Sequence, residues 1–181
     1  MRGKKHKVLF VGRMSLQKGP DYFLRTAQKV LQEREDVEFI MAGTGPELKN
    51  MINLSISLNI HDKVRFLGFV PRRELKQLYS QADVYLMPSV SEPFGITALE
   101  AASSGVPVIV SKNAGVSEFL NSCIKVDFWD VGLISRKLIS LLEHDALRKE
   151  LSASALNECR NLKWDLVADK TADVYRELCN A

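Results

Sequence analysis

The stretch DVYLMPSVSEPFGITALEAASSGVPVIVS (83–111) decides the fold, because it places one helix pattern between two strand patterns. Its first seven and its last five residues are short apolar runs of the kind that form buried strands. From about 95 to 104, small and apolar residues favour a helix. A strand, a helix and a second strand in this order predict two parallel strands joined by a crossover helix.

The same alternation continues on both sides of this stretch. Further strands are predicted at 7–12, 37–43, 63–70 and 123–126, and further helices at 19–34, 45–59 and 71–82. From about 129 to 180 the chain is expected to be helical, with breaks near His144–Asp145 and Asn161–Trp164. Because strands that alternate with helices build a parallel sheet covered on both faces, the sequence predicts an α/β, doubly wound, Rossmann-like fold.

Length and composition fit one such domain over residues 1–181. Hydrophobic residues make up 46% of the chain and charged residues 26%, which is an ordinary globular balance. The formal net charge of +3 is too small to indicate nucleic acid, and we expect the basic leader, about residues 1–6, to be solvated. No stretch reaches transmembrane length. Three widely spaced cysteines fit a reducing, cytosolic setting better than a disulfide framework.

Ligands of doubly wound sheets bind beyond the carboxyl ends of the strands, so the residues after each strand are candidates for a site. After the first predicted strand, Arg13 and Lys18 lie in a loop that leads into a helix. Two cations at a helix N-terminus make a good phosphate site, although two ordinary surface cations would give the same pattern. GTGPE (43–47) lacks the third glycine of a dinucleotide fingerprint, and we interpret it as a turn that begins a helix at Pro46.

The loop after the first strand of the opening stretch carries two carboxylates eight residues apart, Glu92 and Glu100. Gly95 lets a ligand approach the backbone, and the free N–H groups of Gly95, Ile96 and Thr97 would point at it. Glu92 could instead be an acid that stabilises a helix start. Glu100 lies among apolar neighbours, where an unpaired carboxylate is costly, and it could accept hydrogen bonds from a vicinal diol such as a ribose.

Other residues that could carry chemistry predict no second site. The three histidines are isolated, without a partner at the spacing of a metal site or a catalytic triad, so no metal is expected. Trp129 and Trp164 are expected to anchor the core rather than to act as stacking platforms.

Taken together, these motifs resemble the C-terminal domain of retaining GT-B glycosyltransferases, one half of the GT-B fold. The resemblance is to the group that includes glycogen synthases, sucrose synthases and mannosyltransferases (glycosyl transferases group 1). It covers roughly residues 7–180 and rests on GRMSLQKG, GTGPEL, VRFLGFV, LYSQADVYLMPSVSEPFGITALEAASSGVPVIVS and GVSEFL, in that order. The paired-glutamate motif E-x7-E of this group falls on Glu92 and Glu100.

The resemblance implies a site for a nucleotide diphosphate sugar, without a metal or another cofactor. Arg13 and Lys18 would grip the diphosphate, together with the amides of 95–97. Glu100 would bind the ribose, and Glu92 would contact the transferred sugar near the reacting face. The backbone around Phe69 and Val70 would line the base pocket, and Gly12 and Phe94 are further expected substrate contacts.

The resemblance also implies that the chain is an incomplete enzyme. In this family an N-terminal Rossmann domain holds the acceptor, and the present chain begins directly at the first strand of the C-terminal domain. We therefore expect a hexosyltransferase whose sugar or glucan acceptor binds to an absent domain, located in the cytoplasm or peripheral to a membrane. Two alternatives stay open: a GT-B nucleotide-sugar 2-epimerase domain and a non-catalytic nucleotide-sugar-binding module.

Overall fold

The computed structural model describes residues 5–179, apart from the side chains of Trp164 and Leu166. Residues 1–4 of the predicted basic leader therefore lie outside the described residues. His6, its last residue, already belongs to the first strand.

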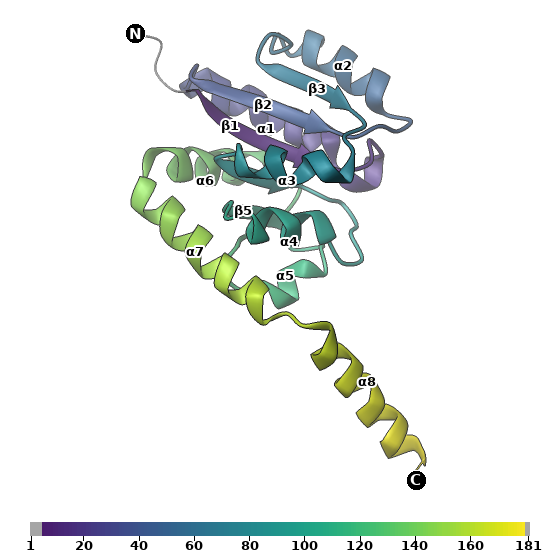
Figure 1. The fold of residues 1–181 in the computed structure, drawn as a ribbon. Coiled ribbons are helices and arrows are strands. Elements are labelled where there is room, and N and C mark those ends of the chain that lie inside the picture. Colours follow the sequence, from purple (N-terminus) through teal and green to yellow (C-terminus); the bar gives the residue numbers. More distant parts are fainter. Residues whose placement is uncertain (1–4, 180–181) are drawn as a thin grey trace.

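Within the described residues, six parallel strands form one sheet (Figure 1). They are β1 (His6–Val11), β2 (Val37–Ala42), β3 (Val64–Gly68), β4 (Val84–Met87), β5 (Val108–Ser111) and β6 (Ile124–Val126). Their order is β3-β2-β1-β4-β5-β6, so the winding reverses between β1 and β4. This is the doubly wound arrangement, and it places a ligand crevice at the reversal point. All six predicted strands are present, and the predicted fold class is confirmed.

Helices cover both faces of the sheet and bury two separate apolar clusters. One cluster lies against α1 (Pro20–Glu33), α2 (Leu48–Ser57) and α6 (Val131–Glu143). The other lies against α3 (Arg72–Ser80), α4 (Ile96–Ser103), α5 (Val116–Phe119) and α7 (Asp145–Asn161). Neighbouring residues of β1 divide between them, since Val8 and Phe10 join the first cluster and Leu9 the second. This division follows from the two-residue period of a strand.

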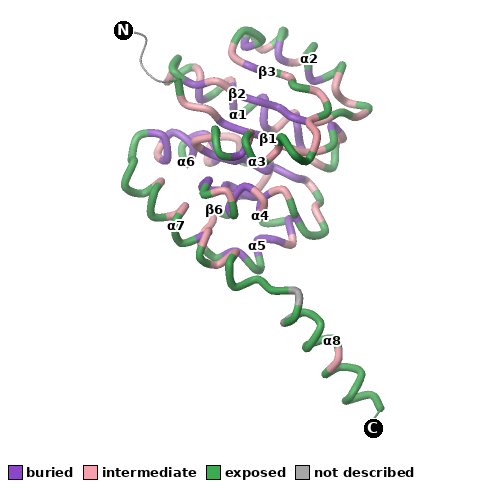
Figure 2. Tube along the Cα trace, in the orientation of Figure 1, coloured by how far each residue is buried: buried purple, intermediate pink, exposed green. Residues whose placement is uncertain are grey.

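The last helix, α8 (Trp164–Cys179), extends away from the body of the protein (Figure 1). It is exposed along nearly all of its described length (Figure 2). Breaks on either side of α7 fall where the sequence predicted them. In the part of the chain that the structure describes, no helix is both long and apolar enough to cross a bilayer.

Three expectations about local structure were wrong or incomplete. The helix expected to begin at Pro46 begins at Leu48, because the N–H of Leu48 bonds to the carbonyl of Gly45 and closes a turn first. Trp129 is 58% exposed and packs edge-on against Phe128, so it does not anchor the core. The short helices η1 (Leu16–Lys18) and α5 were not predicted, since neither is long enough to show a helical period.

The loops that follow β1 and β4 touch each other at the reversal point. Gly19 has φ 65°, and a Cβ atom there would lie only 2.0 Å from the carbonyl oxygen of Pro88. The N–H groups of Val90 and Ser91 both donate to the carbonyl of Gln17, at 2.9 and 3.2 Å. The backbone of one loop therefore fixes the backbone of the other.

Replacement of Gly19 by alanine tests this contact, with Gly68 as a matched control. Gly68 has nearly the same φ, 66°, but a Cβ there would meet nothing within 4 Å. We expect Gly68→Ala to lower the free energy of unfolding by about 1 kcal/mol, the penalty of a left-handed alanine. Gly19→Ala should lower it by about 3 kcal/mol or more, because the methyl group also displaces Pro88. Urea unfolding measures both, and equal losses would show that the two loops are not in close contact.

Candidate functional site

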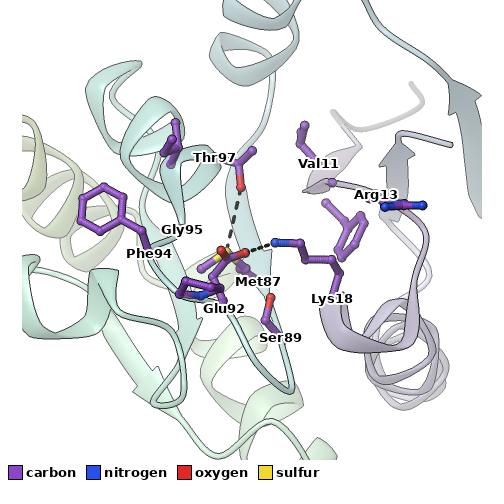
Figure 3. A pocket seen from close by; sticks show the side chains of 13 residues that line it. Val11, Arg13, Lys18, Met87, Ser89, Glu92, Phe94, Gly95 and Thr97 are labelled. Atoms are coloured by element: carbon purple, nitrogen blue, oxygen red, sulfur yellow. Dashed lines mark hydrogen bonds and ion pairs between the residues drawn. The ribbon is translucent and has the colours of Figure 1, made fainter. Parts of the chain in front are cut away.

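Two adjoining clefts open at the carboxyl ends of the strands. The first, here called the switch-point cleft, has a volume of about 340 Å³ and lies between the segments after β1 and β4 (Figure 3). Its walls are Phe10, Val11, Gly12, Arg13, Lys18, Met87, Ser89, Glu92, Pro93, Phe94, Gly95, Ile96 and Thr97. The second, the β1–β3 cleft, has a volume of about 460 Å³. Its walls are Val11, Gly12, Arg13, Ala42, Gly43, Thr44, Gly45, Phe69, Val70 and Leu75.

The structure brings nearly all the predicted site residues to these clefts. Arg13 and Gly12 belong to the wall that both clefts share. Phe69 and Val70 line the β1–β3 cleft, with Phe69 76% exposed. The other predicted residues line the switch-point cleft, with one exception: Glu100, one turn further along α4 than Thr97, lines neither cleft.

Lys18 and Glu92 form an ion pair across the switch-point cleft. The Lys18 ammonium donates to Oε2 of Glu92 (Figure 3), and the two side chains are 28% and 11% exposed. The family resemblance implied separate roles for these residues, Lys18 on the phosphates and Glu92 on the sugar. Without a ligand they are partners, so an anion that binds Lys18 has to compete with the Glu92 carboxylate.

The loop that carries Glu92 is held by the segment after β5. The carbonyl of Glu92 accepts from the N–H of Gly115 at 3.0 Å, and that of Phe94 accepts from Val116 at 2.5 Å. A Cβ atom on Gly115 would lie 2.2 Å from the carbonyl oxygen of Pro93, so only glycine permits this approach. These bonds fix the point at which α4 begins.

The N-terminus of α4 faces the switch-point cleft without a side-chain cap. Gly95 precedes the helix with φ 105°, and a Cβ there would press against Met87 and Val116 at 2.9 Å. The first intrahelical bond runs from the N–H of Ala98 to the carbonyl of Gly95, at 3.0 Å. Amides before Ala98 have no intrahelical partner, and they carry the positive end of the helix dipole. The predicted amides of 95–97 are therefore available to an anion.

Two buried tyrosines hold the polar residues of α4, and sequence analysis missed both. The Tyr79 hydroxyl donates to Oε2 of Glu100 at 3.0 Å. This carboxylate therefore has a hydrogen-bond partner, which its apolar neighbours in the sequence could not provide. The Tyr85 hydroxyl hydrogen-bonds to Oγ1 of Thr97 at 2.8 Å. Burial raises the pKa of both phenols above the ordinary value, so both stay protonated. Their sequence signal was weak, because tyrosine is common in cores.

The loop after β2, which contains GTGPE (43–47), lines part of the β1–β3 cleft. Interpreting this segment only as a turn that begins a helix had not assigned it to a site. A Cβ on Gly43 would lie 1.9 Å from the carbonyl oxygen of Gly12, and one on Gly45 would lie 2.4 Å from that of Met14. These glycines let the β2 loop pack directly against the β1 loop. Both glycines lie at or just after the end of a predicted strand, and this position could have marked them as candidate site residues.

No group of three His, Cys, Asp or Glu side chains gathers as a metal site within residues 5–179. The switch-point cleft instead offers two cations, a helix N-terminus and one carboxylate. That set suits a ligand that combines an anion with hydroxyl groups.

Fold and cleft define an α/β Rossmann-like domain with a candidate ligand site at its reversal point. Residues 1–158 match the family described as Glycosyl transferases group 1, and the chain belongs to this family of transferases. An uncharacterised glycosyltransferase of Methanocaldococcus jannaschii is 36% identical over 174 residues, 93% of this chain and 44% of that protein. A D-inositol 3-phosphate glycosyltransferase of Corynebacterium diphtheriae is 34% identical, over 92% of this chain and 41% of that protein.

The fold is shared with solved structures. HepE of Anabaena, solved in complex with UDP, superposes with a TM-score of 0.85 at 19% identity, over 97% of this chain and 50% of that one. The chain thus spans half or less of the length of these relatives.

Replacing Glu92 by glutamine tests the competition for Lys18. Because the neutral amide no longer neutralises the ammonium, we expect Glu92→Gln to bind inorganic pyrophosphate a few-fold more tightly than the unaltered chain. Isothermal titration calorimetry measures this, with Glu118→Gln, a change in α5 outside both clefts, as the control. Weaker pyrophosphate binding to Glu92→Gln would show that Glu92 does not oppose the anion.

Proposed function

We propose that this chain is the donor-binding domain of a retaining hexosyltransferase. It binds a nucleotide diphosphate sugar, and the sugar or glucan acceptor is held by a domain outside these 181 residues. The observation that carries the proposal is the convergence of Arg13, Lys18 and the N-terminus of α4 on one cleft. Membership of a transferase family and the UDP bound to HepE, a protein of the same fold, support it.

The diphosphate belongs at the wall that the two clefts share. Arg13 lines both clefts, so an anion beside it can extend a nucleoside into one and a sugar into the other. When the bond between the sugar and the phosphate breaks, negative charge develops on the departing nucleoside diphosphate. Fixed cations and helix amides stabilise that charge where it forms. Arg13 and Lys18 are therefore proposed as catalytic residues.

Glu92 is proposed to hold the transferred sugar. Once a phosphate binds the Lys18 ammonium, the Glu92 carboxylate is released from the ion pair and can accept hydrogen bonds from sugar hydroxyls. Its backbone, tied to Gly115, keeps it at the mouth of the same cleft. Phosphate binding and sugar binding are therefore coupled, because the phosphate releases the Glu92 carboxylate from Lys18 and the sugar hydroxyls need that carboxylate as an acceptor.

Glu100 is proposed to hold the ribose, with the base against Phe69 and Val70. Leu75 lines the β1–β3 cleft, and Tyr79 follows it by one turn on the same face of α3. Tyr79 is therefore proposed to hold the Glu100 carboxylate close enough to this cleft for a bound ribose to reach it. Its hydroxyl occupies Oε2 and leaves Oε1 to accept from a ribose hydroxyl.

We also propose a reducing, cytosolic setting for the protein. Cys123, Cys159 and Cys179 are all free thiols. Burial raises the pKa of the Cys123 thiol to about 11, which keeps it protonated and poorly reactive at neutral pH.

Nucleoside diphosphate binding without metal tests the proposal directly. We expect at least one of UDP, ADP and GDP to bind the chain in the presence of a chelator. Arg13→Ala and Lys18→Ala should each weaken that binding by about 1.5–3 kcal/mol, the range for a hydrogen bond to a charged group. Lys49→Ala, at an exposed cation of α2, should leave it unchanged. Failure of all three nucleotides to bind at millimolar concentration, measured by calorimetry, would overturn the proposal.

The ribose assignment makes a separate prediction. Glu100→Gln should weaken the ribonucleotide by about 1–3 kcal/mol and Tyr79→Phe by about 1 kcal/mol, because both changes disturb the carboxylate that faces the ribose. Neither should affect the 2′,3′-dideoxy analogue, which has no hydroxyls to offer. Titration of both nucleotides against both variants decides the matter, and an equal loss for the dideoxy analogue would contradict the assignment.

A further inference from the structure

The hydroxyl of Ser89 is buried in the wall of the switch-point cleft without a partner. Ser89 is 0% exposed, and its Oγ makes no hydrogen bond to any described residue. Other buried serines are satisfied: Ser55 donates to the carbonyl of Ile52 at 2.7 Å, and Ser111 accepts from the N–H of Asn113 at 3.1 Å. Among the buried hydroxyls of the described residues, only that of Thr26 in α1 also lacks a hydrogen-bond partner, and Thr26 lines neither cleft. Native proteins rarely leave such a group unpaired without a reason.

The backbone on both sides of Ser89 is fixed, so the residue as a whole cannot easily move away from the cleft. Pro88 packs against Gly19. Val90 donates its N–H to Gln17 and accepts at its carbonyl from Nδ2 of Asn113 at 3.0 Å. Figure 3 shows the Ser89 oxygen pointing toward the Lys18–Glu92 ion pair. The unpaired donor thus faces the place where a cation now holds a carboxylate.

We infer that Ser89 is a further ligand-binding residue of the proposed donor site, and that its hydroxyl donates to a phosphate oxygen of the nucleoside diphosphate. The inference rests on the proposed function. A group that displaces a carboxylate from a lysine is itself an anion, so the phosphate rather than a neutral sugar hydroxyl arrives beside Lys18. A hydroxyl that donates to an anion makes a strong, charge-assisted hydrogen bond.

This assignment separates binding from stability. In the ligand-free protein the buried hydroxyl is unsatisfied, which disfavours the folded state, and removing it relieves that penalty. In the complex the phosphate satisfies it. Ser89→Ala should therefore weaken phosphate binding without lowering the stability of the free chain, whereas a merely structural serine would show the reverse.

The experiment combines calorimetry with thermal unfolding of the 181-residue chain. The probes are inorganic pyrophosphate and whichever of UDP, ADP and GDP binds the unaltered chain. We expect Ser89→Ala to weaken both probes by roughly 10- to 100-fold, with an unchanged or raised Tm. Thr26→Val should leave both affinities unchanged, because its orphan hydroxyl lies outside the clefts. Ser111→Ala should lower the Tm but leave the affinities unchanged, because its hydroxyl has a structural partner.

Three results would overturn the inference while leaving the proposed function intact. The first is nucleotide binding to Ser89→Ala as tight as to the unaltered chain. The second is a loss for the nucleotide without a loss for pyrophosphate, which would place the contact away from the phosphates. The third is a clear fall in Tm, the mark of a structural role. Failure of Ser89→Ala to fold is the extreme form of this third result and would overturn the inference in the same way. Ser89→Cys is the second variant, since a thiol of similar size is a weak donor and should show the same loss of binding. No binding to the unaltered chain would instead overturn the proposed function itself.

Discussion

The contact between Gly19 and the carbonyl oxygen of Pro88 is the constraint on which the site depends. Doubly wound topology brings the carboxyl ends of β1 and β4 together, but it does not set how closely the loops beyond them approach. A side chain at position 19 would hold them apart, since a Cβ would lie 2.0 Å from that oxygen. The two bonds to the carbonyl of Gln17 then lock the loops in one register.

Three polar groups of the switch-point cleft are placed by this contact. Lys18 immediately precedes Gly19, while Ser89 and Glu92 follow Pro88, so the cation, the hydroxyl and the carboxylate converge from segments about 70 residues apart. The uncapped N-terminus of α4 completes the set. Without a ligand Lys18 and Glu92 neutralise each other, and the helix end and the hydroxyl remain unsatisfied. We therefore regard the ligand-free cleft as a site that an anion would rearrange rather than simply fill.

The fold and the local motifs could be predicted from sequence because their signals are local. Alternating apolar runs gave the strands, and the spacing of Glu92 and Glu100 marked the loop after β4. Contacts made across the crossovers could not be predicted. The pairing of Lys18 with Glu92 and of Tyr79 with Glu100 depends on which strands lie side by side, which no single segment encodes. Trp129 was misplaced for a related reason, because apolar character alone does not say which face a loop residue presents.

A crystal structure of the chain with a bound nucleoside diphosphate tests the central claim most directly. The account predicts the diphosphate between Lys18 and the amides of 95–97, with the Glu92 carboxylate released from the lysine. A diphosphate bound elsewhere while the Lys18–Glu92 ion pair stays intact would contradict it.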